Sequence, residues 1–146
     1  MTTGQQQALL DALEAEYAAV YAYGVVAAYA NTDRARLVAE YVAAHRARRD
    51  STIDALKLAG VAVPAPDPAY TTPFPVDDPI PAARLAVAVE NDCAIAWRAV
   101  VERADTAEVR RTGIDGLTES AARQASWQKI LGASPATVAF PGKPAQ

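Results

Sequence analysis

The stretch VAVPAPDPAYTTPFPVDDPIP, residues 61–81, decides how the rest of this chain can be arranged. It holds seven of the ten prolines in the 146-residue sequence, so it cannot be helical and is expected to be extended. An extended segment of about 20 residues reaches up to roughly 66 Å, whereas a helix of about 25 residues is only about 37 Å long. The stretch can therefore run along the whole length of a helical bundle.

Two long helices are predicted on each side of this stretch, because apolar residues recur there at helical spacing and strand-like alternation is nowhere sustained. The first covers about residues 5–30, and the second, capped by Thr32 or Asp33, runs to about residue 59, before Gly60. The third starts near Pro81, and the fourth runs from Asp105 or Thr106 to about residue 131. The chain is predicted to be all-α.

The lengths of the connections predict the topology. Short connections make neighbouring helices antiparallel, whereas the long stretch lets helices two and three run parallel. The prediction is a four-helix bundle of two antiparallel hairpins joined by a long proline-rich crossover. The bundle is assigned to residues 1–131, with the crossover at 60–80, and residues 132–146 form an extended C-terminal tail. The alternative, two separate hairpins on a flexible linker, is disfavoured because neither hairpin alone could bury its apolar stripe.

Composition excludes several classes of function. The chain is 51% apolar and 21% charged, as in soluble globular proteins, and its net charge of −3 gives no basic footprint for nucleic acid. The first ten residues do not resemble a signal peptide, and no apolar run is long enough to span a membrane. A cytoplasmic protein without a membrane partner is expected. A single cysteine, Cys93, excludes an internal disulfide and a cysteine-rich zinc site.

A buried polar core is the main candidate site. Glu16, Glu90 and His45, the only histidine, fall on the apolar stripes of helices one, three and two. Two buried carboxylates without a metal repel each other unless they are paired, and a guanidinium pairs with them best. Arg49, four residues after His45, is predicted to be that partner, with Arg48 as the alternate donor. In the other interpretation, His45 is simply hydrogen-bonded in the core and the arginines lie at the surface.

Three segments, LEAEYAAVYAYG (13–24), AAHRARRD (43–50) and LAVAVENDCAIAW (85–97), together with the crossover, resemble the ferritin-like superfamily. The chain is most similar to small, alanine-rich ferritin-like proteins of unknown function from actinobacteria, over about residues 5–131. Metal-binding members hold two metal ions with one Glu from each of two helices and a Glu-x-x-His from each of the other two. By this resemblance, Glu16 and Glu90 occupy the single-Glu positions.

The same resemblance implies a degenerate di-iron site. Val42 stands three residues before His45, where the pattern has glutamate, and Glu40 lies too far around the helix to replace it. Helix four cannot supply a second histidine, and Glu119 and Arg123 are predicted on its solvated face. Its inward stripe is predicted to be Ile114, Leu117, Ala121, Gln124, Gln128 and Leu131.

These patterns favour a binding or structural role, without a metal or other cofactor, over an enzyme. The alternative is a metal-dependent oxidase or small-molecule enzyme in which Glu16, His45 and Glu90 hold one iron, manganese or zinc ion. A third possibility is an assembly module whose surface carries the function. A homodimer is expected, with Val25, Val26 and Tyr29 in its interface. The sequence indicates no particular ligand.

Overall fold

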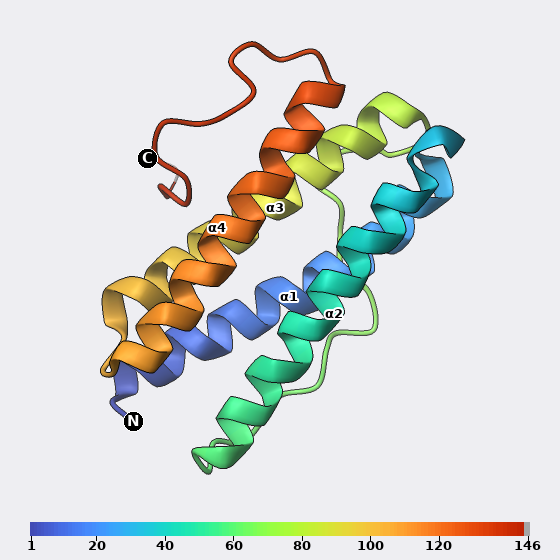
Figure 1. Cartoon of the computed structure of the whole chain (residues 1–146). Coiled ribbons are helices and arrows are strands. Elements are labelled where there is room, and N and C mark those ends of the chain that lie inside the picture. The colour runs from blue at the N-terminus through green and yellow to red at the C-terminus, as the bar shows by residue number, and fades with distance from the viewer. Residues whose placement is uncertain (145–146) are drawn as a thin grey trace.

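The computed structural model describes residues 1–144, which form four long helices and no strand (Figure 1). The helices are α1 (Thr3–Tyr29), α2 (Ala35–Leu58), α3 (Pro79–Arg103) and α4 (Ala107–Ile130), and a short 3-10 helix, η1 (Thr32–Arg34), precedes α2. The all-α prediction is confirmed. None of the described helices has the length and apolar character needed to cross a bilayer.

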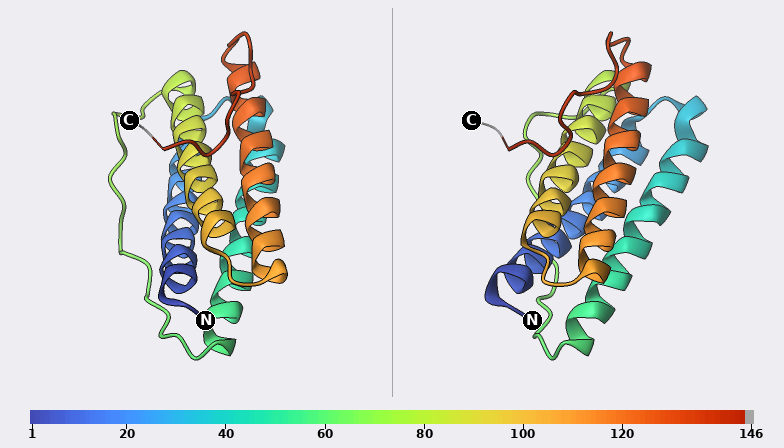
Figure 2. Two further views of the ribbon diagram at one scale, coloured as in Figure 1. Left: turned by 90° about the vertical axis from the view of Figure 1, so that its left-hand side faces the viewer. Right: turned by 60° about the vertical axis from the view of Figure 1, so that its left-hand side comes forward.

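The crossover gives the bundle its topology. Residues 59–78 return along the outside of the bundle to the end at which α2 began, so α2 and α3 run parallel (Figures 1 and 2). The crossover lies against α1, where the Tyr17 hydroxyl donates to the Pro64 carbonyl (2.8 Å) and the rings of Tyr21 and Tyr70 are 5.7 Å apart. The predicted pair of antiparallel hairpins is therefore docked into one bundle, and the flexible-linker alternative is wrong.

Threonine side chains cap two of the helices. The Thr2 hydroxyl accepts from the Gln5 amide at the start of α1, and the Thr106 hydroxyl accepts from the Val109 amide at the start of α4. Asp105, the other predicted start of helix four, accepts instead from the Thr2 amide and hydroxyl, each at 2.8 Å. These bonds fasten the N-terminus of the chain to the α3–α4 connection.

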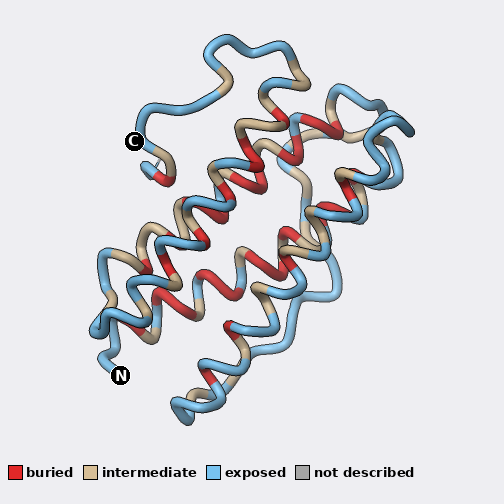
Figure 3. Tube along the Cα trace, viewed as in Figure 1, coloured by how far each residue is buried: buried red, intermediate tan, exposed pale blue. Residues whose placement is uncertain are grey.

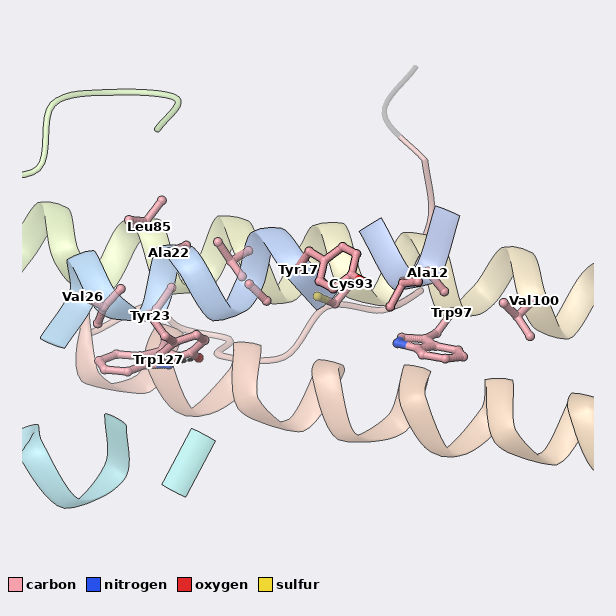
Figure 4. Packing of buried hydrophobic residues seen from close by; sticks show 14 of the residues in the cluster. Ala12, Tyr17, Ala22, Tyr23, Val26, Leu85, Cys93, Trp97, Val100 and Trp127 are labelled. Atoms are coloured by element: carbon pink, nitrogen blue, oxygen red, sulfur yellow. Dashed lines mark hydrogen bonds between the residues drawn. The ribbon is translucent and has the colours of Figure 1, made fainter. Parts of the chain in front are cut away.

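The core lies between α1, α3 and α4. Helix α2 packs against it through a narrow stripe of buried side chains (Figure 3). The indole rings of Trp97 and Trp127, both fully buried, lie between α4 and the layer formed by α1 and α3 (Figure 4). In α2 only four side chains are buried, at intervals of seven, seven and four residues: Val38, His45, Thr52 and Leu56.

Helix α4 faces the core with a different side from the one predicted. Ile114 is 44% exposed, and of the predicted inward stripe only Gln124 is buried. Close approach to α3 decides the orientation, because a Cβ atom on Gly116 would lie 2.6 Å from the Trp97 ring. The buried residues of α4 are Gly113, Gly116, Ser120, Arg123, Gln124 and Trp127.

After α4 the chain turns back over the bundle. Val138 and Phe140 remain 43% and 72% exposed, whereas Gly142 is buried beside Ala94 of α3 and has a positive φ of 76°. Only glycine adopts this backbone conformation without strain, and a Cβ there would lie 2.6 Å from the Ala94 carbonyl oxygen. Residues 145–146 of the predicted tail lie outside the described residues.

Candidate functional site: a buried cluster of two glutamates, a histidine and an arginine

Each long helix contributes one ionisable residue to a buried group, here called the polar cluster. It consists of Glu16 from α1, His45 from α2, Glu90 from α3 and Arg123 from α4. The first three residues are fully buried and Arg123 is 7% exposed. Charged residues at this depth are costly unless they are paired, so the pairing determines what the cluster can do.

His45 bridges the two carboxylates through opposite ring nitrogens. Its Nδ1 lies 2.5 Å from Oε2 of Glu16, and its Nε2 lies 2.9 and 3.0 Å from the two oxygens of Glu90. Burial by itself lowers the pKa of His45, but the hydrogen bonds and negative charges of Glu16 and Glu90 outweigh it and raise the pKa to about 9. The imidazole is therefore a cation at neutral pH and donates to both carboxylates.

Arg123 supplies the second cation. Its Nε lies 3.1 Å from both oxygens of Glu90, and one of its terminal nitrogens donates to the Ser120 hydroxyl at 3.4 Å. Burial lowers the pKa of Arg123, but the Glu90 charge outweighs this effect and the pKa is raised overall. The guanidinium carbon also lies 6.0 Å from the Tyr41 ring centroid, which suits a cation–π contact.

Aromatic donors complete the cluster at both ends. The Trp97 indole donates to Oε1 of Glu16 (2.8 Å), and the Tyr23 hydroxyl donates to Oε2 of Glu90 (2.6 Å) while accepting from the Trp127 indole (3.0 Å). Burial and the Glu90 charge raise the pKa of Tyr23, which keeps its proton available for donation. Every carboxylate oxygen in the cluster therefore has a protein donor.

Formal charges in the cluster cancel, because two carboxylates face one imidazolium and one guanidinium. Within residues 1–144, the only buried side-chain polar atom without a partner is Oε1 of Gln124, which is not part of the cluster. The formal charges of the polar cluster thus sum to zero, and the protein supplies a hydrogen-bond partner to every carboxylate oxygen and to both imidazole nitrogens.

The structure brings Glu16, His45 and Glu90 together, but the prediction for Arg49 is wrong. Its Nε pairs with Asp50 at 2.8 Å, and its side chain is 28% exposed. Arg48, the alternate donor, pairs with Glu119 of α4 and stacks over Trp97. The buried stripe of α2 is narrow, so residues three and four positions after His45 fall on its two flanks.

Arg123 is the donor that sequence reasoning missed, because the face of α4 was misjudged. Glu119 does lie at the surface as predicted, but Arg123 does not. The sequence signal that could have identified Arg123 is Trp127, a large apolar residue expected to face the core. Arg123 and Ser120 precede Trp127 by four and seven residues, so they lie on the same face of the helix. Ser120 and Arg123 then stand three residues apart, the spacing of a Glu-x-x-His pair.

Three side chains have donor atoms close enough to share a metal ion. The donor atoms of Glu16, His45 and Cys93 lie within 4.8 Å of one another, and all three residues are buried. Burial and the charges of Glu16 and Glu90 raise the pKa of the Cys93 thiol, whose Sγ lies 3.6 Å from the Ala15 carbonyl oxygen. In this arrangement Cys93 is a protonated thiol that packs as a small apolar residue.

The helix order and the long crossover give this chain the fold of a ferritin-like four-helix bundle. A family model described as a domain of unknown function, DUF4439, matches residues 8–145, and the chain belongs to this family.

Two solved structures are similar to this chain. One is the crystal structure of a conserved hypothetical protein, rv2844, from Mycobacterium tuberculosis, with 42% sequence identity and a TM-score of 0.87 over 89% of this chain and 98% of the other. The second is a dodecameric thioferritin, the bacterioferritin-related protein from Bacteroides fragilis. It is 20% identical with a TM-score of 0.71, covering 88% of this chain and 84% of the other, so it supports the fold alone. Among curated proteins, no match to this chain is found.

Proposed function

We propose that this protein is a ferritin-like bundle in which the polar cluster takes the place of a metal centre. It acts as a binding or structural protein and not as a metal-dependent oxidase. The observation that carries the proposal is the placement of Arg123, whose Nε lies 3.1 Å from both oxygens of Glu90. A guanidinium in this position binds the Glu90 carboxylate, which a metal ion would need as a ligand.

The charge of the cluster supports the proposal. A divalent ion bound to His45 would require the imidazole to lose its proton, which leaves two carboxylates, one guanidinium and the metal. With Cys93 protonated, the buried site would then carry one uncompensated positive charge, and an unpaired buried charge costs several kcal/mol, about 3–5 kcal/mol in measured cases. Without metal, the same residues are neutral and paired.

The residues do not fit the two-metal pattern of the superfamily. That pattern needs six ligands. Glu16, Glu90 and His45 match three of them, but Val42 and Ser120 stand where the other two carboxylates would be. Arg123, a cation, stands where the second histidine would be. We therefore assign no metal-dependent step to this protein.

A second candidate is a metal-dependent enzyme holding one iron, manganese or zinc ion, which the proximity of Glu16, His45 and Cys93 favours. A carboxylate, an imidazole and a thiolate together suit zinc. The three residues expected from the sequence, Glu16, His45 and Glu90, suit a single ion less well. The two carboxylates lie at opposite nitrogens of the imidazole ring, so an ion bound to one nitrogen is close to only one of them.

A metal titration followed by thermal unfolding separates the two candidates. A ligand that binds only the native state raises the melting temperature. We expect Zn²⁺, Mn²⁺ and anaerobic Fe²⁺ to leave the wild-type melting temperature unchanged. The matched variant Val42→Glu/Ser120→Glu/Arg123→His, which restores the six-ligand pattern, is expected to be stabilised by the same ions. A saturable rise for wild type that Cys93→Ala removes would establish the second candidate.

We also propose that the protein forms a homodimer through the outer face of α1 and α2. A groove of about 370 Å³ lies there, lined mainly by small or apolar side chains that include Val20, Ala39 and Val42. Of the residues first expected in the interface, Val26 is fully buried and cannot contribute, whereas Tyr29 is 43% exposed. A contiguous exposed surface of apolar side chains is typical of a contact site.

A further inference from the structure

A second cavity lies at the end of the bundle where α1 and α4 end and α3 begins, which is the upper end in Figure 1. Its volume is about 630 Å³, within the range of about 300–1,000 Å³ that is common for small-molecule sites. The floor includes Trp127, which is 1% exposed, and Ala83, which is 4% exposed. Ile80, 55% exposed, and Val87 form part of the wall.

The rim of this cavity is cationic. Arg34 from η1 and Arg84 from α3 both line it, and its lining, all within residues 1–144, contains no aspartate or glutamate. Neither arginine forms an ion pair with a described residue. Lys129 lines an adjoining depression that also includes Arg34. Two uncompensated guanidinium groups at one cavity stand out in a chain with a net charge of −3.

We propose that this end cavity binds a small organic anion with an apolar body, of the class of medium-chain carboxylic acids. The apolar wall and the Trp127 floor would cover the hydrocarbon part, since burial of apolar surface is favourable by about 25 cal/mol per Å². Guanidinium groups at the rim pair with a carboxylate through two parallel hydrogen bonds. The two arginines of the lining match the charged end of such a ligand, and the apolar side chains of the lining, which include Ala83, Val87 and Trp127, match its hydrocarbon part.

Trp127 allows ligand binding in the end cavity to be followed by tryptophan fluorescence. This residue is part of the cavity lining, and its indole nitrogen donates to the Tyr23 hydroxyl, which in turn donates to Glu90 of the polar cluster. A ligand in the cavity therefore changes the surroundings of a buried tryptophan. The site does not depend on the function proposed for the polar cluster, because none of the four cluster residues lines it.

The test is calorimetric titration of the full-length protein with octanoate and, as the uncharged analogue, 1-octanol, with tryptophan emission as a second readout. We expect octanoate to bind at least ten times more tightly than octanol. The exposed pair Arg34→Ala/Arg84→Ala should remove that preference. The control pair Arg36→Ala/Arg103→Ala changes the net charge equally, at exposed residues outside the cavity lining, and should bind octanoate as wild type does.

A second variant, Ile80→Asp, places a negative charge on the exposed part of the wall and should also abolish octanoate binding. Unchanged melting temperatures would show that these surface variants are folded. The proposal is overturned if folded wild type does not bind octanoate, if octanol binds equally well, or if the control pair weakens binding as much as Arg34→Ala/Arg84→Ala does.

Discussion

Arg123 donates from one nitrogen to both carboxylate oxygens of Glu90, at 3.1 Å to each, from a position that is 7% exposed. His45 contacts the same two oxygens from another helix. Glu90 is therefore held between two cations, and Glu16 balances the second positive charge through His45. This pairing gives each of the two buried carboxylates a positively charged partner from the protein itself.

Replacing Arg123 with methionine should destabilise the protein by about 3–5 kcal/mol, because it leaves a buried carboxylate without its charge partner. The matched control is Arg49→Met, since Arg49 is partly exposed and pairs only with its neighbour Asp50. We expect that control to change the free energy of unfolding by no more than about 0.5 kcal/mol, as is usual for surface substitutions. Urea denaturation of both variants measures the difference.

The double variant Glu90→Met/Arg123→Met should be more stable than Arg123→Met alone, because it removes the stranded charge together with its partner. Glu16 and His45 then remain as a neutral ion pair. Equal or greater destabilisation of the double variant in the same urea experiment would show that the Arg123 cost does not come from an unpaired Glu90.

Stability should decrease between about pH 6.5 and pH 9. The folded protein raises the pKa of His45 from 6.5 to about 9, so the stabilisation from its protonated form is complete below pH 6.5. It is lost as the pH rises through about 9, and its size is on the order of 3 kcal/mol by proton linkage. Urea midpoints measured at half-unit steps from pH 6 to pH 9 test this, and a flat or rising profile would contradict it.

Gly116→Ala should be destabilising although alanine favours helices. The added Cβ would lie 2.6 Å from the Trp97 ring, and overpacking of this kind costs about 1–3 kcal/mol. Gly24 in α1 is the matched control when both variants are made in an Ala39→Arg background, because Gly24 lines the proposed dimer groove and a Cβ there has no neighbour within 4 Å in the single chain. Gly24→Ala should stabilise the protein by roughly 0.5–1 kcal/mol. Thermal unfolding that gives both variants the same sign would refute the close approach of α3 and α4.

Self-association can be tested at the outer groove of α1 and α2. Ala39 is exposed and lines this groove, so Ala39→Arg should convert the proposed dimer to a monomer in multi-angle light scattering at micromolar concentration. Thr118→Arg, at an exposed position of α4, is the control and should remain dimeric. A wild-type monomer mass would exclude the dimer, and a dimer that survives Ala39→Arg would place the interface elsewhere.

The sequence alone was enough to predict the topology, because seven prolines in one stretch leave the chain few options. It also placed Glu16, His45 and Glu90 inward, since each has large apolar neighbours at helical spacing. The buried face of helix α4 was predicted wrongly, because it contains two glycines, a serine, an arginine and a glutamine beside Trp127. Such a face is selected by close packing against Trp97 and by charge pairing with Glu90, and hydrophobic periodicity detects neither.

The most direct test of the polar cluster is the metal content of the purified protein, measured by inductively coupled plasma mass spectrometry after expression in medium supplemented with iron, manganese and zinc. If His45 and Arg123 neutralise Glu16 and Glu90, as proposed, no metal should be present in stoichiometric amount, in wild type or in Glu16→Gln. One metal ion per chain in wild type that is lost in Glu16→Gln would contradict the account and make His45 a ligand.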